Sequence, residues 1–493
     1  MTRFRYLALA LVLIAGATAW GILITHCDYN YDEVLRAHSV WLTSQGLQPY
    51  HDFFECHPPY FALLTPFVRD QADSVASLMT LRLVAVAGNL LFLAGLATLA
   101  RINGVGGWPV AVLGTALVAF HPAILEYLGE SRIDGWGYAL ATWSIVWLLR
   151  SQRTWRYAAL GVGTGIATLL FCPKLALLPP MIFLIEQIRR RSVLRIALRD
   201  FAMYAIGAAA AGGLFGCWLA ANGINLNLTF ACVARYNSLY NFHSGFGRGL
   251  LHQIMAMPTL SLPVLAALLT WAVHCFRAKT LPAAYPLALA LWLLTQALMV
   301  SYPYKQYYGP WFLFASGFFP FLYSTLESLA RRTMFAVFFG LCGLSISLSA
   351  VSAHNWVQSH QLKNEEGFLR TLNEITNPED YIVTVPPLHP IDRRDTFYLF
   401  FNTYDPAGHE TEETLDEIPL LRHHVSEQRY REELKAHPPV LVILWPDSYP
   451  RRQKAVLGQF LQENGYVKAM LEAVPVAVRP DRLDRFSSRH AEK

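Results

Sequence analysis

Long apolar runs in the first 350 residues constrain the fold of this chain more than any other feature. Runs of roughly 17–22 apolar residues recur there, and a helix needs about 20 to cross the bilayer core. Only 15% of the 493 residues are charged, whereas a soluble domain carries about 25%. The runs are continuous rather than alternating, which excludes a membrane β-barrel. The sequence therefore predicts a polytopic α-helical membrane protein.

About eleven transmembrane helices are expected from these runs. The N-terminal run has a signal peptide as its alternative, because Ala17-Thr18-Ala19 has the form of a cleavage site. The run continues to Thr25, however, and the apolar region of a signal peptide is only about 7–15 residues long. We therefore expect an uncleaved first span over residues 6–25. The others are expected at 82–100, 108–127, 135–149, 157–171, 174–188, 201–221, 254–275, 281–300, 309–327 and 334–351.

Basic residues at alternate ends of these spans predict the orientation of the chain. The positive-inside rule assigns such clusters to the cytoplasm, which puts the N-terminus inside and the first loop, about 26–81, outside. Short loops and an outward tail suit a bacterial inner membrane. The net charge of +5 belongs to these short loops and gives no indication of nucleic-acid binding. The clusters are Arg3 and Arg5; Arg101; Arg150, Arg153 and Arg156; Arg189, Arg190, Arg191, Arg195 and Arg199; Arg277 and Lys279; and Arg331 and Arg332.

The chain changes character near residue 352, where long apolar runs end and charged residues become dense. We expect a transmembrane domain over 1–351 and a soluble domain over 352–493. β-rich runs at 381–385, 397–401 and 440–445 alternate with segments of helical composition at 427–436 and 451–464. This alternation predicts a small α/β extracytoplasmic domain, with a role in acceptor recognition or support.

The first loop contains an unusual density of acidic residues beside a membrane surface, where such groups are often functional. Asn30 followed by Glu33 has the spacing of a capping box, and Asp32 would suit the helix dipole. The apolar residues that follow at helical spacing predict an amphipathic helix on the membrane. A cap explains one acid well, yet Asp28, Asp32 and Glu33 lie within six residues.

Three segments of this loop follow one another in a characteristic order. They are the Asp32-Glu33 pair, the segment Pro49-Tyr50-His51-Asp52 and the segment His57-Pro58-Pro59. This order resembles the first extracytoplasmic loop of the GT-C superfamily of membrane glycosyltransferases. It is most similar to the branch that holds protein O-mannosyltransferases and the aminoarabinose transferase of lipid A. The motifs cover roughly residues 1–190, and the remainder resembles the superfamily in layout alone.

The resemblance implies transfer of a sugar from a polyprenyl-phosphate donor to a hydroxyl group of a lipid, glycan or protein acceptor. It assigns the catalytic base to Asp32, with Glu33 in a supporting role, because a carboxylate near the acceptor hydroxyl can remove its proton. Asp134 matches a second acid of the family by position. Apart from membrane lipids, the donor and the acceptor are the expected partners.

Donor-phosphate binding is expected at Lys174 and Lys305, because basic residues of the family in similar places hold the lipid phosphate. Snorkelling at the interface is their alternative. Arg132 either binds phosphate or forms a buried pair with Glu130 or Asp134, and His57 either contacts phosphate or caps the next helix. Asp52 is assigned to the same donor site. No metal ligands are assigned, because Asp52, Glu55 and His57 lack a metal-specific spacing; the need for a divalent cation stays open.

A transporter or flippase of a lipid-linked sugar or another solute is the alternative function. Transporters concentrate ionisable residues near the middle of the membrane, at broken helices in repeated halves. Here the acids lie at the outer ends of spans, which favours the enzyme. A membrane scaffold would leave the acidic loop unexplained.

Overall fold

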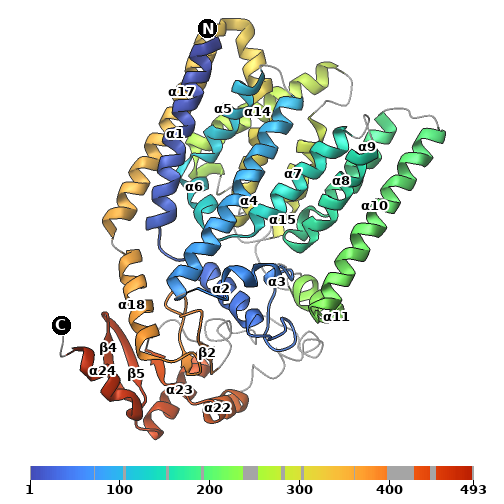
Figure 1. The fold of residues 1–493 in the computed structure, drawn as a ribbon. Coiled ribbons are helices and arrows are strands. Elements are labelled where there is room, and N and C mark those ends of the chain that lie inside the picture. Colours follow the sequence, from blue (N-terminus) through green and yellow to red (C-terminus); the bar gives the residue numbers. More distant parts are fainter. Residues whose placement is uncertain are drawn as a thin grey trace. The chain divides into compact units, whose positions relative to one another are not determined.

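The computed structural model describes residues 2–490, except 72, 104–106, 151–154, 190–193, 237–251, 253, 279–283, 301–304, 360, 397–426 and 445–450. The chain divides into two compact units (Figure 1). Unit 1 comprises Met1–Cys27, Arg82–Trp218 and Ser244–Gln358, and unit 2 comprises Asp28–Leu81, Leu219–His243 and Ser359–Lys493. The first loop therefore belongs to the same unit as the C-terminal segment. The boundary expected at 351/352 stays a prediction.

All regular secondary structure in the described residues of unit 1 is helical. Arg82, which is 1% exposed, donates from its guanidinium to the carbonyls of Ile24 (3.0 Å) and Cys27 (2.8 Å) at the end of the first helix. Such a cation satisfies carbonyls that a helix end leaves open. The helices are α1 (Thr2–His26), α4 (Ser74–Asn103), α5 (Gly107–Ala119), α6 (Pro122–Gly129), α7 (Asp134–Arg150), α8 (Trp155–Ala167), α9 (Leu178–Arg189), α10 (Leu194–Ala221), α14 (Pro258–Ala278), α15 (Tyr285–Val300), α16 (Lys305–Ser316) and α17 (Phe319–Ser359).

Five helices among the described residues are long and apolar enough to cross a membrane. They include the first helix, which continues past the A-x-A site to His26. α5 and α6 form a further apolar pair bent by 84° at the short break before Pro122. The polytopic helical class is thereby supported, whereas the number eleven stays a prediction. The five spans are Tyr6–His26, Ser74–Ile102, Leu198–Ala221, Pro258–Arg277 and Phe335–Ser359.

Unit 2 combines short helices with a five-stranded mixed sheet. The sheet consists of β1 (Tyr381–Val383), β2 (Arg394–Asp395), β3 (Leu441–Ile443), β4 (Val467–Leu471) and β5 (Val474–Val478), in the order β2-β1-β3-β5-β4. β1 pairs in parallel with β2 and β3, while β5 pairs antiparallel with β3 and β4. The helices are α2 (Tyr31–Ser44), α3 (Phe61–Leu64), α11 (Leu226–Phe230), α18 (Gln361–Ile375), α22 (Glu427–Ala436), α23 (Arg451–Glu463) and α24 (Leu483–His490).

The predicted elements of the C-terminal segment are largely present. β1 and β3 lie inside the runs at 381–385 and 440–445, and α22 and α23 occupy the two segments of helical composition. The run at 397–401 lies outside the described residues. The hairpin of β4 and β5 was not expected. Its turn, Glu472-Ala473, has positive φ at both residues (44° and 67°), although neither residue type favours that conformation.

Candidate functional site

The N-terminus of α2 has the predicted capping box. The Asn30 side chain accepts from the backbone N–H of Asp32 (3.0 Å), and the Glu33 carboxylate accepts from the backbone N–H of Asn30 (3.0 Å). Glu33 is 1% exposed, so its carboxylate serves the cap from a buried position. The helix itself is confirmed, but it differs from one lying free on a membrane, since every residue from Glu33 to Leu42 is buried.

Asp32 is the acid of this turn that keeps an accessible side chain beside a cation. Its carboxylate lies 4.0 Å from the guanidinium of Arg36, one helical turn on, and 28% of the side chain is exposed. Asp28, by contrast, accepts from the side-chain amide of Gln361 on α18 (3.0 Å). Sequence reasoning missed Arg36, whose position four residues after Asp32 was the available signal.

A network of polar side chains continues from Arg36 into the His-Pro-Pro segment. The guanidinium lies 3.3 Å from Nε2 of His57, and Nδ1 of His57 lies 2.5 Å from the Glu55 carboxylate. Since a guanidinium only donates and a carboxylate only accepts, His57 carries its proton on Nδ1 and accepts at Nε2. The other Glu55 oxygen accepts from Ser39 of α2 (2.8 Å). His57 thus supports Arg36 and Asp32 through this network.

The Pro49–Asp52 segment forms a tight turn that fixes this network from the other side. Tyr50 has a positive φ of 69° and donates its hydroxyl to the carbonyl of His57 (2.6 Å). The Asp52 carboxylate accepts from the backbone N–H of Gln48 (2.7 Å) and from Nδ1 of His51 (2.7 Å). Asp52 therefore closes the turn. Its expected place at the donor site stays a prediction.

The remaining predicted site residues lie in unit 1. Arg132 forms a buried ion pair with Glu130, which is one of the two structural pairs expected for it, and Asp134 begins α7. Lys174 lies in a short 3₁₀ turn (Pro173–Leu175) with its ammonium 3.6 Å from the centre of the Tyr307 ring. Lys305 is the first residue of α16, and its side chain lies outside the described part of the chain.

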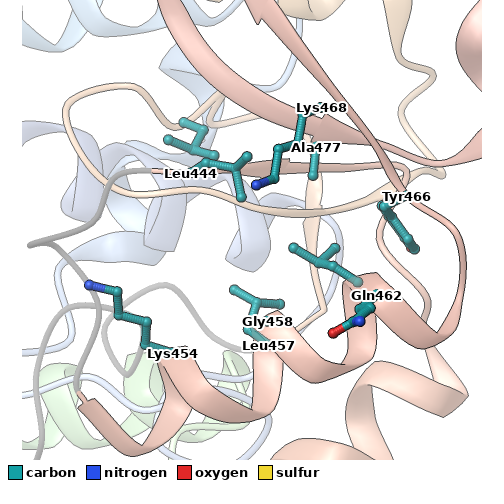
Figure 2. A pocket seen from close by; sticks show the side chains of 10 residues that line it. Leu444, Lys454, Leu457, Gly458, Gln462, Tyr466, Lys468 and Ala477 are labelled. Atoms are coloured by element: carbon teal, nitrogen blue, oxygen red, sulfur yellow. The ribbon is translucent and has the colours of Figure 1, made fainter.

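A cavity of about 520 Å³ lies in the C-terminal part of unit 2, between the sheet and α23 (Figure 2). Leu444, Leu457 and Ala477 contribute apolar surface, while Lys454 of α23 and Lys468 of β4 bring two positive charges from opposite walls. None of the described residues that line it is acidic. Such a cavity has the chemistry to hold an anionic group attached to an apolar body.

Two crystal structures of ArnT from Cupriavidus metallidurans match almost the whole chain. The structure bound to undecaprenyl phosphate has a TM-score of 0.61 at 14% identity, covering 97% of this chain and 98% of that one. The chain has the ArnT fold. The apo ArnT structure agrees, with a TM-score of 0.56, 13% identity and coverage of 95% and 97%.

ArnT is a lipid A aminoarabinose transferase with the GT-C fold. The resemblance to the GT-C superfamily is therefore confirmed at the level of the fold. Comparison with protein-family models gives no match, and comparison with curated proteins gives none either.

Proposed function

We propose that this chain transfers a sugar from a polyprenyl-phosphate donor to a hydroxyl-bearing acceptor at the outer face of a bacterial inner membrane. The observation that carries the proposal is the accessible Asp32 carboxylate next to Arg36, at a capped helix start. It lies within a chain that has the ArnT fold, and ArnT has been crystallised with undecaprenyl phosphate.

Asp32 is the proposed general base. It takes the proton of the acceptor hydroxyl while that oxygen bonds to the anomeric carbon of the sugar. The bond between this carbon and the phosphate oxygen breaks, and polyprenyl phosphate leaves with the electron pair. The capping box of Asn30 and Glu33 holds the helix start at which the base lies. Arg36 keeps a positive charge beside the carboxylate.

Donor binding is assigned to basic side chains on the outward side. Lys174 is the best supported of them, because the residue is exposed and its ammonium lies over the Tyr307 ring, which orients it without a carboxylate in that contact. Lys305 and Arg132 are further candidates for the phosphate, and Asp134 for a second acid. In this proposal the N-terminus is cytoplasmic and the C-terminal domain extracytoplasmic.

A transporter of lipid-linked sugar is the second candidate, because α5 and α6 form an apolar pair broken at 84°. Transporters place substrate sites at such broken helices. A transporter would move a labelled lipid-linked sugar between leaflets without forming a new glycosidic bond. An Asp32 substitution would then change the flux, with no transfer product in either protein.

The test is transfer of radiolabelled sugar from polyprenyl-phosphate donors by purified protein in liposomes, with a bacterial envelope extract as the acceptor pool. Asp32→Asn should lose transfer while donor binding is kept. Asp28→Asn is the matched control, because Asp28 lies four residues earlier and contacts Gln361. Equal transfer by wild type and Asp32→Asn would remove Asp32 as base. Absence of transfer from every donor by folded protein would reject the enzyme.

A further inference from the structure

The middle of α2 meets the C-terminal domain at a buried cluster of two histidines and one aspartate. His38 of α2 and His389 of the β1–β2 loop are both 0% exposed, and the Asp395 side chain at the end of β2 is 6% exposed. One ligand-type atom from each residue lies within 4.8 Å of the others. The two imidazole rings lie with their centroids 4.4 Å apart and their planes tilted by 47°.

The hydrogen bonds of His38 determine where its ring proton lies. Nδ1 is 2.8 Å from the backbone carbonyl of Ile391, and a carbonyl only accepts, so Nδ1 carries the proton. The Ile391 peptide is itself held, because its N–H donates to Ser74 (3.1 Å). In a neutral ring, Nε2 then points a lone pair at the Asp395 carboxylate 2.6 Å away. A lone pair and a carboxylate repel each other at this distance, so a cation has to lie between Nε2 and Asp395, either a second ring proton or a metal ion.

His389 distinguishes these two solutions. Its Nε2 lies 2.8 Å from the second oxygen of Asp395, yet neither atom has an aligned hydrogen bond within the described part of the chain, and Nδ1 has none either. A proton shared along the line between nitrogen and oxygen would produce an aligned bond. A neutral imidazole nitrogen at this position can act as a metal ligand. A proton on His38 therefore leaves Nε2 of His389 without a partner among the described residues, whereas a shared cation would take one ligand atom from each of the three residues.

We propose that His38, His389 and Asp395 bind one divalent transition-metal ion of the zinc class, which fastens α2 to the C-terminal sheet. Two imidazoles and one carboxylate suit zinc, which also accepts a small fourth ligand such as water. Calcium and magnesium prefer oxygen ligands throughout. A metal-bound histidine usually donates its other N–H to a carbonyl or carboxylate, as His38 does to Ile391. This inference does not depend on the proposed sugar transfer.

Binding requires only a small adjustment of the side chains. Zinc bonds of about 2.0–2.1 Å separate neighbouring ligand atoms by about 3.3 Å in a tetrahedral site. The contacts of 2.6 Å and 2.8 Å would therefore open by roughly half an ångström. The role is structural, because the cluster is buried and the proposed base, Asp32, lies six residues before His38 on the same helix.

The first test measures metal content in the full-length protein purified through a tag without histidine, loaded with zinc and desalted. Elemental analysis should find about one zinc per chain, as for a high-affinity structural site. Asp395→Asn and His389→Gln should each lose most of it. His437→Gln is the matched control, since His437 belongs to the same unit and its side chain is 43% exposed; it should keep the metal. Retention of zinc by both cluster variants would overturn the proposal.

X-ray absorption spectroscopy of the zinc-loaded wild type does not depend on any variant folding. The expected spectrum contains two imidazole ligands, further oxygen ligands and no sulfur. A sulfur shell at about 2.3 Å would place the metal at the other candidate cluster, Glu55, Cys56 and His57, and would overturn the assignment. Wild type that retains neither zinc nor cobalt would also overturn it and would leave a second proton on His38 as the cation.

Discussion

The first turn of α2 and the middle of that helix differ in what they offer to a substrate. Asp32 in the first turn keeps 28% of its side chain exposed beside a guanidinium. His38, less than two turns later, is 0% exposed and held between the Ile391 carbonyl and Asp395. A single helix thus presents an accessible acid at its start and a sealed contact in its middle. The difference teaches that accessibility, rather than ionisable character, separates a reactive group from an anchoring group.

The largest effect is expected at Asp32, the accessible acid in the first turn of α2. Asp32→Asn should lower turnover by about 10²–10⁴-fold, the range that a general base contributes, with little change in thermal stability. Initial rates with labelled donor, alongside melting curves, would measure both. If Asp32→Asn destabilises the protein as much as a substitution in the His38 cluster does, Asp32 would be an anchoring residue like His38 rather than a reactive one.

The second prediction concerns the buried contact of His38 with Asp395. Asp395→Ala should destabilise unit 2 by about 3–5 kcal/mol, because it leaves buried polar groups without their partner. Hydrogen exchange followed by mass spectrometry should show faster exchange in α2 and in the β1–β2 loop. Arg394→Ala, at the neighbouring exposed position of β2, is the matched control and should exchange as the wild type does. Unchanged protection of α2 in Asp395→Ala would contradict an anchoring role.

The third prediction concerns Glu33, which lies next to Asp32 and is buried like His38. Its variants test whether Glu33 serves the helix cap or the reaction. Glu33→Ala should cost about 1 kcal/mol of stability through loss of the cap. Glu33→Gln should retain it, because glutamine also serves in a capping box. Comparison of melting temperatures and turnover in the two variants separates the cap from the charge. A loss of turnover in Glu33→Gln as large as that in Asp32→Asn would give Glu33 a share of the base.

The smallest effect is expected away from α2, at the cavity of the C-terminal domain. Lys454→Glu combined with Lys468→Glu should raise KM for an anionic acceptor severalfold and leave kcat unchanged, since an exposed charge contributes about 1 kcal/mol or less. Salt titration of the acceptor KM provides the measurement. Lys435→Glu on α22 is the control for net charge. An equal rise of KM in that control would mean that the effect comes from the net charge of the domain and not from the cavity.

Local signals in the sequence predicted what lies at the start of α2. The Asn30 cap, Glu33 at the third position and the acid between them are all neighbours in sequence, so the capping box followed from spacing alone. α22 and α23 were found for the same reason, from helical composition bounded by strand runs. The helical class of the transmembrane part followed from the length of its apolar runs, because the thickness of the bilayer sets how many apolar residues a spanning helix needs.

The buried cluster around His38 could not be predicted, because its residues are far apart in sequence and only the tertiary fold brings them together. Asp395 lies 357 residues beyond His38, and the sequence around it has no metal-type spacing. The Glu472-Ala473 turn was missed for another reason. Its positive φ angles arise from pairing of β4 with β5 rather than from residues that favour them. Both cases depend on tertiary contacts that override local preference.

The long separation between α2 and its partners has a consequence for how the protein is made. Asp28 and His38 leave the ribosome early, while Gln361, Ile391 and Asp395, which they contact, are among the last quarter or so of the chain. At about 5–20 residues per second, the roughly 350 residues between them take on the order of 20–70 seconds to synthesise. Through that interval the first loop lacks its contacts with the C-terminal segment, so a chain that stalls or is cut near residue 350 has the proposed base, Asp32, in a loop without those contacts.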